Sequence, residues 1–315
     1  MFFLGLIFFK PLSKTLIAFF ILFEILSCLL DYNRWQPWEY QYLLTFYIFL
    51  FSNNKTQIIK LISILICFTY IFSGLHKLNG GFIYLIWESM ILGKLLHFNF
   101  DSHNIIIHYF GLFIPIIEII LGIGILIFTK KKYFILGLII MHLLIIYFLC
   151  PIGLNYNLIV IPWNLLMLLL IIILFHNTNM NFIKNFQPFY KFDFVIIILV
   201  CLLPILNFFS LWDDYLSFNL YSGNNQTMVV EVERIEQIPE LKKHSSSNKI
   251  YKILKNSTPI YINSMAMSEI KVPLYSEKRT FKIFKKQWDK KYPQLKKRFF
   301  VFRYPYSKQA VYEIQ

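Results

Sequence analysis

Long apolar runs, separated by short groups of basic residues, dominate the first 209 residues of this chain. A helix that crosses a membrane needs about 20 mostly apolar residues. Seven runs come close to that length: 14–30, 38–52, 57–75, 104–128, 133–150, 156–175 and 193–209. The runs predict an all-α polytopic membrane bundle of about seven transmembrane helices over residues 1–209, with the lipid bilayer as its surroundings.

The segment 80–99 is also apolar, but Glu88 and Lys94 interrupt it. Charged groups inside a bilayer are costly, so an uninterrupted span is the less favoured interpretation. We expect a re-entrant or interfacial segment here. An eighth span is the alternative.

Basic residues follow an alternating pattern along the predicted bundle, and such residues favour the cytoplasmic side. One set of helix ends holds nine of them: Lys10, Lys14, Lys55, Lys60, Lys130, Lys131, Lys132, Lys184 and Lys191. The opposite ends hold Arg34, Lys77 and Lys94. The pattern predicts a multi-pass protein of the cell membrane with a cytoplasmic N-terminus and an extracytoplasmic C-terminal region. The Met1–Phe9 run is short and lysines follow it, so we expect no cleavable signal peptide.

Residues 210–315 have a different composition and predict a small water-facing α+β domain. They hold 19 of the 31 Lys and Arg residues and 10 of the 17 Asp and Glu residues, a net charge of +9 (19 − 10). We expect a solvated surface from this excess, with an anionic membrane surface or an acidic partner as the alternatives. Binding of nucleic acid is not expected.

Short β-branched runs and one amphipathic run define the expected elements of this domain. Strands are predicted at Thr227–Val232, Ile250–Leu254, Ile260–Ile262 and Arg298–Arg303. A helix is predicted at Glu277–Lys290, because Phe281, Phe284 and Trp288 recur at helical spacing. His244–Asn248 is expected to form a loop.

Three ionisable residues lie inside the predicted spans: Glu24, Glu118 and His142. Each is a functional candidate, because such groups are costly in lipid. The alternative is a buried hydrogen bond that fixes helix packing. If Glu118 and His142 face each other, they form a proton-relay pair.

The stretch Tyr70–Leu78, YIFSGLHKL, ends the third predicted span. Its small residues Ser73 and Gly74 allow close approach of another helix. His76 and Lys77 then place two ionisable groups where the helix leaves the lipid. A partly desolvated lysine can act as a base, whereas an interfacial lysine that extends toward water is the alternative.

Two further polar stretches are expected on the same side of the membrane as Lys77. The first, Asp31–Leu44, contains the candidate residues Asp31, Arg34 and Trp35; an aromatic belt at the interface is its alternative interpretation. The second, Leu211–Gly223, contains Asp213 and Asp214. Lys77, Arg34 and the basic C-terminal region are their candidate partners, and a capped helix end is the alternative. Together the stretches predict an outward-opening cavity.

The segment YIFSGLHKLN resembles the Gly-x-x-Lys-Leu segment of vitamin K-dependent gamma-carboxylases. The loop LDYNRWQPWEYQYL resembles the Asp–Trp–Tyr-Leu loop of that family, at a matching place in the order of helices. The likeness covers roughly residues 14–209 and extends to bacterial proteins with the horizontally transferred transmembrane domain. It implies a quinone cofactor, Lys77 as the base that deprotonates the reduced form of this cofactor, and His76 beside Lys77.

The sequence also departs from the carboxylase pattern. Trp35 is followed by Gln36, Pro37 and Trp38, where the carboxylases have Asn-Asn-His. The rival hypothesis is therefore a non-catalytic membrane scaffold whose domain at 210–315 binds an envelope protein. A transporter is a weaker alternative, because no internal repeat is apparent.

Neither the cysteines nor the histidines predict a redox or metal site. Cys28, Cys67, Cys150 and Cys201 form no C-x-x-C pair. His97, His103 and His108 are spaced by six and five residues, whereas ligands on one helix usually lie three or four apart.

Overall fold

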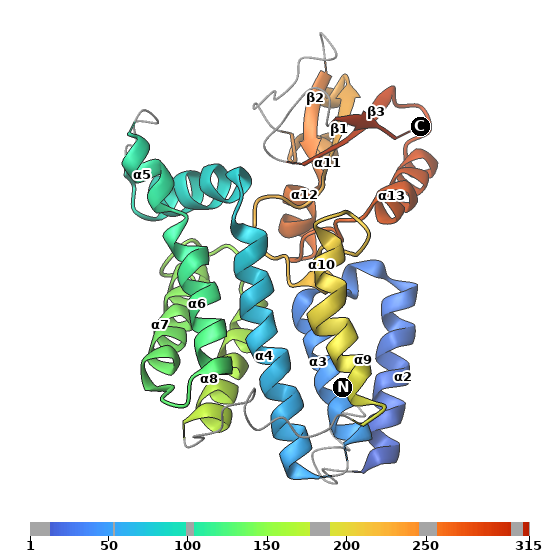
Figure 1. The fold of residues 1–315 in the computed structure, drawn as a ribbon. Coiled ribbons are helices and arrows are strands. Elements are labelled where there is room, and N and C mark those ends of the chain that lie inside the picture. Colours follow the sequence, from blue (N-terminus) through green and yellow to red (C-terminus); the bar gives the residue numbers. More distant parts are fainter. Residues whose placement is uncertain are drawn as a thin grey trace.

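The computed structural model describes residues 13–52, 54–98, 104–176, 190–245, 257–303 and 311–314. The protein is mostly helical, with one small antiparallel sheet. The helices before residue 210 stand side by side, and the sheet lies beyond one end of them (Figure 1). We call this the domain end of the bundle.

Each apolar run of the sequence forms helix; the bounds of 14–30 are as predicted, and those of the other runs differ. The helices are α2 (Lys14–Leu30), α3 (Pro37–Phe51), α4 (Lys55–Lys77), α5 (Ile105–Phe110), α6 (Phe113–Ile127), α7 (Lys132–Leu149), α8 (Val160–Phe175), α9 (Asp193–Ile197) and α10 (Leu203–Asn207). A π-helical stretch, η3 (Ile198–Leu202), joins α9 to α10. The predicted run 156–175 starts later, at Val160, and the run 193–209 ends earlier, at Asn207.

Among the described residues, three helices are long and apolar enough to cross a membrane. They are Lys55–Lys77, Ile105–Ile127 and Lys132–Leu149. Val160–Phe175 and Asp193–Asn207 are shorter apolar helices. The remaining two predicted spans form α2, with 17 residues, and α3, with 15. The expected membrane character therefore holds at the level of three helices. Of the other four runs, 14–30 and 38–52 form helices of the predicted length, whereas 156–175 and 193–209 form shorter ones.

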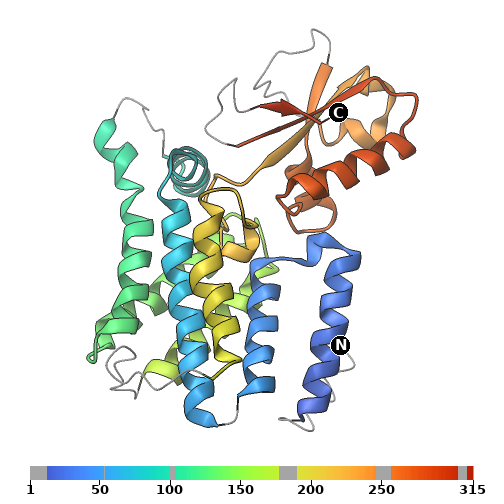
Figure 2. The ribbon, with the colours of Figure 1, turned by 45° about the vertical axis from the view of Figure 1, so that its right-hand side comes forward.

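The segment after α4 lies crosswise to the bundle. It forms the π-helix η2 (Phe82–Leu95), which Figure 2 shows almost end-on at the domain end while the neighbouring helices run upright. This orientation matches the interfacial interpretation of 80–99 and not an eighth span. Glu88, one of its two charged residues, lies 2.5 Å from Nδ1 of His108 in α5.

The most extensive helix packing in the bundle joins α4 to α6, and two glycines lie in this contact. A Cβ atom on Gly74 would lie 2.6 Å from Cγ1 of Ile119 and 2.8 Å from the carbonyl oxygen of Pro115. One on Gly122 would lie 2.9 Å from Cβ of Tyr70. Small residues let two helix backbones approach in this way. The close approach expected at Gly74 is therefore present.

The C-terminal region forms a four-stranded antiparallel sheet of order β2-β1-β3-β4. The strands are β1 (Thr227–Glu233), β2 (Ser257–Tyr261), β3 (Lys297–Phe302) and β4 (Tyr312–Glu313). Central β1 pairs with both neighbours, so that Val230 lies opposite Ile260 on one side and Phe299 on the other. Residues 250–254 lie outside the described residues, as do residues 246–248 of the expected loop.

Helix α13 (Lys278–Lys291) covers the sheet through Phe281 and Trp288, as its spacing predicted. The strand predicted at Ile260–Ile262 overlaps the end of β2, but its last residue, Ile262, instead begins helix α12 (Ile262–Glu269). A short helix, α11 (Pro239–Lys242), follows β1. The core of this domain is separate from that of the bundle.

A polar junction joins the two parts at Asp213 and Asp214. Asp213 pairs with Arg279 and accepts a hydrogen bond of 2.6 Å from the hydroxyl of Tyr275. Asp214 is fully buried and accepts hydrogen bonds from Asn207, Ser276 and Asn219 at 3.0, 3.1 and 3.2 Å. Of the candidate partners, the basic C-terminal region is therefore the one that pairs with Asp213.

Glu277, which accepts a 3.0 Å hydrogen bond from the backbone N–H of Asp214, makes the junction sensitive to pH. Burial, together with the charges of Asp213 and Asp214, raises the pKa of Glu277 to about 7. A group whose pKa is raised by folding stabilises the fold fully below its ordinary pKa, here 4.5. This contribution is lost as the pH rises through about 7.

Replacing Glu277 with Gln should remove this pH dependence, because the amide stays neutral and still accepts the hydrogen bond. We expect the Glu277→Gln protein to unfold at a higher temperature than wild type at pH 8 and at a similar temperature at pH 5. Thermal unfolding in nanodiscs measures this. The control Glu236→Gln removes an exposed carboxylate and should follow wild type; equal shifts in both variants would contradict the assignment.

Adding a methyl group at Gly74 should force α4 and α6 apart, because the nearest obstacle includes the backbone oxygen of Pro115. We expect Gly74→Ala to lower the free energy of unfolding by about 1–3 kcal/mol. Gly137→Ala is the matched control, because its Cβ would meet the flexible end of Leu121. Chemical denaturation should show a smaller loss for the control; a loss as large as at Gly74 would count against the close packing.

Candidate functional site

A small cavity at the domain end of the bundle brings together Lys77, Glu118 and His142. It measures about 60 Å³. The side chains that line it come from α4, α6, α7, α8 and the segment after α10: Thr69, Tyr70, Ser73, Lys77, Glu118, Met141, His142, Ile145, Val160, Trp163, Asn164, Met167, Phe218, Leu220 and Tyr221. Pockets for small molecules usually measure about 300–1,000 Å³, so this cavity has room for a few water molecules.

An ion pair between α4 and α6 forms one wall of the cavity. Nζ of Lys77 lies 2.7 Å from Oε2 of Glu118, and the two side chains are 14% and 7% exposed. The lysine also donates to Oγ of Ser73, one turn earlier in α4, at 2.7 Å. The close packing at Gly74 brings the two helices near enough for this pair. Because both charges are buried, each depends on the other for compensation.

A second polar chain crosses the cavity from α4 to α8. Oη of Tyr70 lies 2.6 Å from Nε2 of His142, and Nδ1 of His142 lies 2.8 Å from Oδ1 of Asn164. The amide of Asn164 donates to the carbonyl oxygen of Val160 at 2.7 Å, so its oxygen is the acceptor for His142. A neutral His142 therefore carries its proton on Nδ1 and accepts from Tyr70 at Nε2.

This chain has the geometry of a histidine oriented for proton transfer. A base that is held by a third group is the arrangement that acid–base sites use. Tyr70 and His142 can exchange a proton over 2.6 Å, and Lys77 and Glu118 can do so over 2.7 Å. Because both pairs line one water-sized cavity, water can connect them.

The segment after α10 covers the cavity with Phe218, Leu220 and Tyr221. Asn79, just past the end of α4, holds this segment by donating to the backbone oxygens of His76 at 2.6 Å and Ser222 at 3.2 Å. Phe218 has a left-handed backbone, with φ of 59°, at the end of a short 3-10 turn. We call residues 218–223 the covering segment.

Two glycines let the covering segment touch the start of η2. A Cβ atom on Gly223 would lie 2.3 Å from the backbone oxygen of Gly81, and Gly223 has a φ of +69°. A larger residue at Gly223 therefore meets both a clash and an unfavourable backbone conformation. The covering segment is fixed by backbone contact as well as by Asn79.

Three of the seven predicted site residues meet at this cavity: Lys77, Glu118 and His142. The expected pair of Glu118 and His142 does not form directly; the two residues share the cavity, while Glu118 pairs with Lys77 and His142 with Tyr70. His76 points elsewhere and stacks on Phe208, with ring centroids 4.5 Å apart. It does not line the cavity beside Lys77.

The loop between α2 and α3 lies at the domain end but outside the cavity. Asp31 caps the short turn η1 (Tyr32–Arg34) by accepting from the backbone N–H of Asn33 at 3.0 Å. Trp35 packs in an apolar cluster with Trp38 and Tyr215. Asp31, Arg34 and Trp35 are therefore not brought together with Lys77 in the lining of this cavity.

Tyr70 and Asn164 were missed as site residues by the sequence analysis. Asn164 is the one amide inside the otherwise apolar run of α8, and this isolated polar residue was a signal that could have found it. Tyr70 belongs to the stretch that contains Lys77, two turns earlier. A tyrosine near a membrane surface is common, so its pairing with His142 had no signal of its own.

No clusters of His, Cys, Asp or Glu suited to a metal occur within the described part of the chain. No family model, no curated protein and no solved structure matches the sequence or the fold. The resemblance to the gamma-carboxylase membrane region therefore stays a prediction from the residues.

Removing either partner of His142 should destabilise the protein, because a buried ring nitrogen is then left without a hydrogen bond. We expect Tyr70→Phe and Asn164→Leu each to lower the free energy of unfolding by about 1–3 kcal/mol. The double variant should lose less than the sum, since both changes act through His142. Chemical denaturation of the four proteins measures this.

Tyr47→Phe is the control, because the hydroxyl of Tyr47 is exposed and donates to the backbone oxygen of Phe192 at 3.4 Å. We expect this variant to have nearly the same free energy of unfolding as wild type. Strict additivity of the Tyr70 and Asn164 effects would show that His142 does not couple them.

Proposed function

We propose that this chain is a multi-pass enzyme of the cell membrane whose proton-transfer centre is the cavity at Lys77, Glu118, His142 and Tyr70. The single observation that carries the proposal is the buried Lys77–Glu118 pair beside the Tyr70–His142–Asn164 chain. Buried ionisable groups in a membrane bundle are costly and mark functional sites. The ion pair and the hydrogen-bonded chain line the same water-sized cavity. This arrangement favours a role in proton transfer over a role in helix packing alone.

The membrane placement is part of the proposal. All seven apolar runs cross the bilayer, the shorter helices by local thinning of the lipid around them. Nine lysines at alternate helix ends against three basic residues at the others put the N-terminus in the cytoplasm. The domain at 210–315 is then extracytoplasmic, and the cavity lies at the outer end.

Lys77 acts as the base, and Glu118 prepares it for that role. In the ion pair the lysine is protonated and cannot accept a proton. Transfer of one proton over the 2.7 Å to Glu118 leaves a neutral amine and a neutral acid. The amine then takes a proton from the substrate, and the pair carries one positive charge in total until a proton leaves by way of the cavity water.

The substrate class is a reduced quinone, as the likeness of YIFSGLHKLN to the carboxylase segment suggests. A quinol hydroxyl is acidic enough to give its proton to an amine in a low-dielectric site. The cavity of about 60 Å³ is too small for the ring, so the ring enters by displacing Phe218, Leu220 and Tyr221 of the covering segment.

Lys77→Ala is the sharpest test, because it removes the amine that takes the proton from the substrate. We expect this variant to bind a reduced naphthoquinone without deprotonating it, whereas wild type shifts its ultraviolet spectrum to that of the anion. Nanodiscs keep the protein in lipid for the measurement.

Lys94→Ala is the matched control, because Lys94 is an exposed lysine at the same end of the bundle. It should behave as wild type. Lys77→Ala leaves Glu118 buried and unpaired, at a cost of about 3–5 kcal/mol, so the double variant Lys77→Met/Glu118→Leu separates folding from activity. A folded wild type that binds no quinone would instead favour a scaffold whose outer domain binds an envelope protein.

A further inference from the structure

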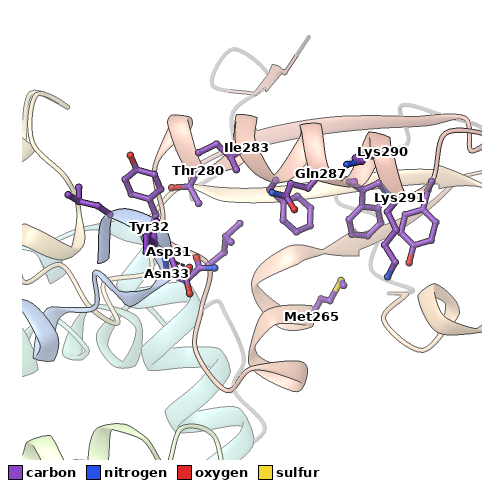
Figure 3. Close-up of a pocket in the computed structure, with 15 residues that line it drawn as sticks. Asp31, Tyr32, Asn33, Met265, Thr280, Ile283, Gln287, Lys290 and Lys291 are labelled. Atoms are coloured by element: carbon purple, nitrogen blue, oxygen red, sulfur yellow. Dashed lines mark hydrogen bonds between the residues drawn. The ribbon is translucent and has the colours of Figure 1, made fainter. Parts of the chain in front are cut away.

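A groove of about 920 Å³ separates the end of α2 from α12 and α13 of the C-terminal domain. Figure 3 shows its lining, with Asp31, Tyr32 and Asn33 at one end and Lys290 and Lys291 at the other. From Thr280 to Lys291, α13 advances about 16 Å along the groove. The size falls within the range of ligand pockets.

The floor of the groove continues into the exposed apolar face of α2. Leu29 and Leu30, which line the groove, are 54% and 89% exposed. The same helix exposes Phe19, Leu22, Phe23 and Leu26 further from the domain. A strip of apolar side chains thus runs along α2 and turns under α13. In the proposed placement of α2 in the bilayer, this strip faces lipid chains.

The far end of the groove is basic. Lys290 and Lys291 are exposed there, and α13 carries seven basic residues against one acidic residue. That acidic residue, Asp289, lies 2.8 Å from Lys285 and 3.1 Å from Lys297. Asp31, the acidic residue of the lining, lies at the opposite end and accepts from Asn33.

A row of aromatic side chains follows α13 toward the basic end of the groove. The rings of Phe284, Trp288 and Tyr292 pack one after another at tilted angles, with centroids 5.2 and 5.3 Å apart. All three line the groove. Rings of this kind favour the boundary between lipid chains and headgroups.

We propose that the groove binds an anionic phospholipid of the bilayer. Its phosphate lies against Lys290 and Lys291, its glycerol backbone against the aromatic row, and its acyl chains descend along Leu29, Leu30 and the exposed face of α2. This rests on the membrane placement proposed above, and it does not depend on the chemistry at Lys77. An acidic peptide would pair with the lysines but leave the apolar strip of α2 uncovered. A phospholipid matches both the lysines and the apolar strip.

Native mass spectrometry of the full-length protein in detergent tests the proposal. The probes are phosphatidylglycerol and phosphatidylcholine with identical chains. We expect wild type to retain the anionic lipid preferentially. The variant Lys290→Gln/Lys291→Gln should bind it roughly 10- to 30-fold more weakly. The control Lys282→Gln/Lys286→Gln removes two exposed lysines of the same helix that do not line the groove, and it should stay close to wild type.

A second measurement places the lipid without removing a charge. Phosphatidylglycerol with brominated chains quenches nearby tryptophans, and we expect Trp288→Phe to remove a quenched component of the emission. The proposal would be overturned if wild type retains both lipids equally, or if the two lysine double variants lose the same amount of phosphatidylglycerol binding. It would also be overturned if wild type and Trp288→Phe show the same quenching. These outcomes leave the quinol test at Lys77 unaffected, so the two proposals fail separately.

Discussion

The close approach of α4 and α6 at Gly74 is the constraint on which the site depends. Without a Cβ at this position, the backbone of α4 comes near Pro115 and Ile119. One turn later this separation lets Lys77 reach Glu118 directly. Helix association in lipid gains little from hydrophobic burial, so tight packing of small residues has to hold such a pair together.

The covering segment gives the C-terminal domain a direct connection to the cavity. Residues 218–223 close the cavity on one side, and β1 of the sheet begins a few residues later. Asp214, fully buried just before the segment, ties it to Asn207 of α10 and to Ser276 of the domain. The domain is therefore held close to the site by hydrogen bonds at Asp214, just before the covering segment.

The lengths of the apolar runs predicted the helices of the bundle, and the change in composition predicted the division of the chain, because both depend on local sequence. The helix α13 followed from helical spacing, and the strands β1 and β3 followed from short runs of strand-forming residues. Residues that act through distant partners were harder to predict from the sequence. Glu118 and His142 were found as candidates because charge in lipid is unusual, but their partners lie 41 and 72 residues away and leave no local signal. Helix α12 was missed because β-branched Ile260 and Ile262 favour a strand.

The backbone contact between Gly81 and Gly223 links the cavity to the crosswise helix η2. For a ring-sized molecule to enter, the covering segment has to lift, and this contact has to separate at the same time. Residues 224–226 join the segment to β1, so lifting the segment also pulls on the start of that strand. Opening of the cavity is then coupled to the position of the C-terminal domain, so whatever holds the domain in place also affects how often the cavity opens.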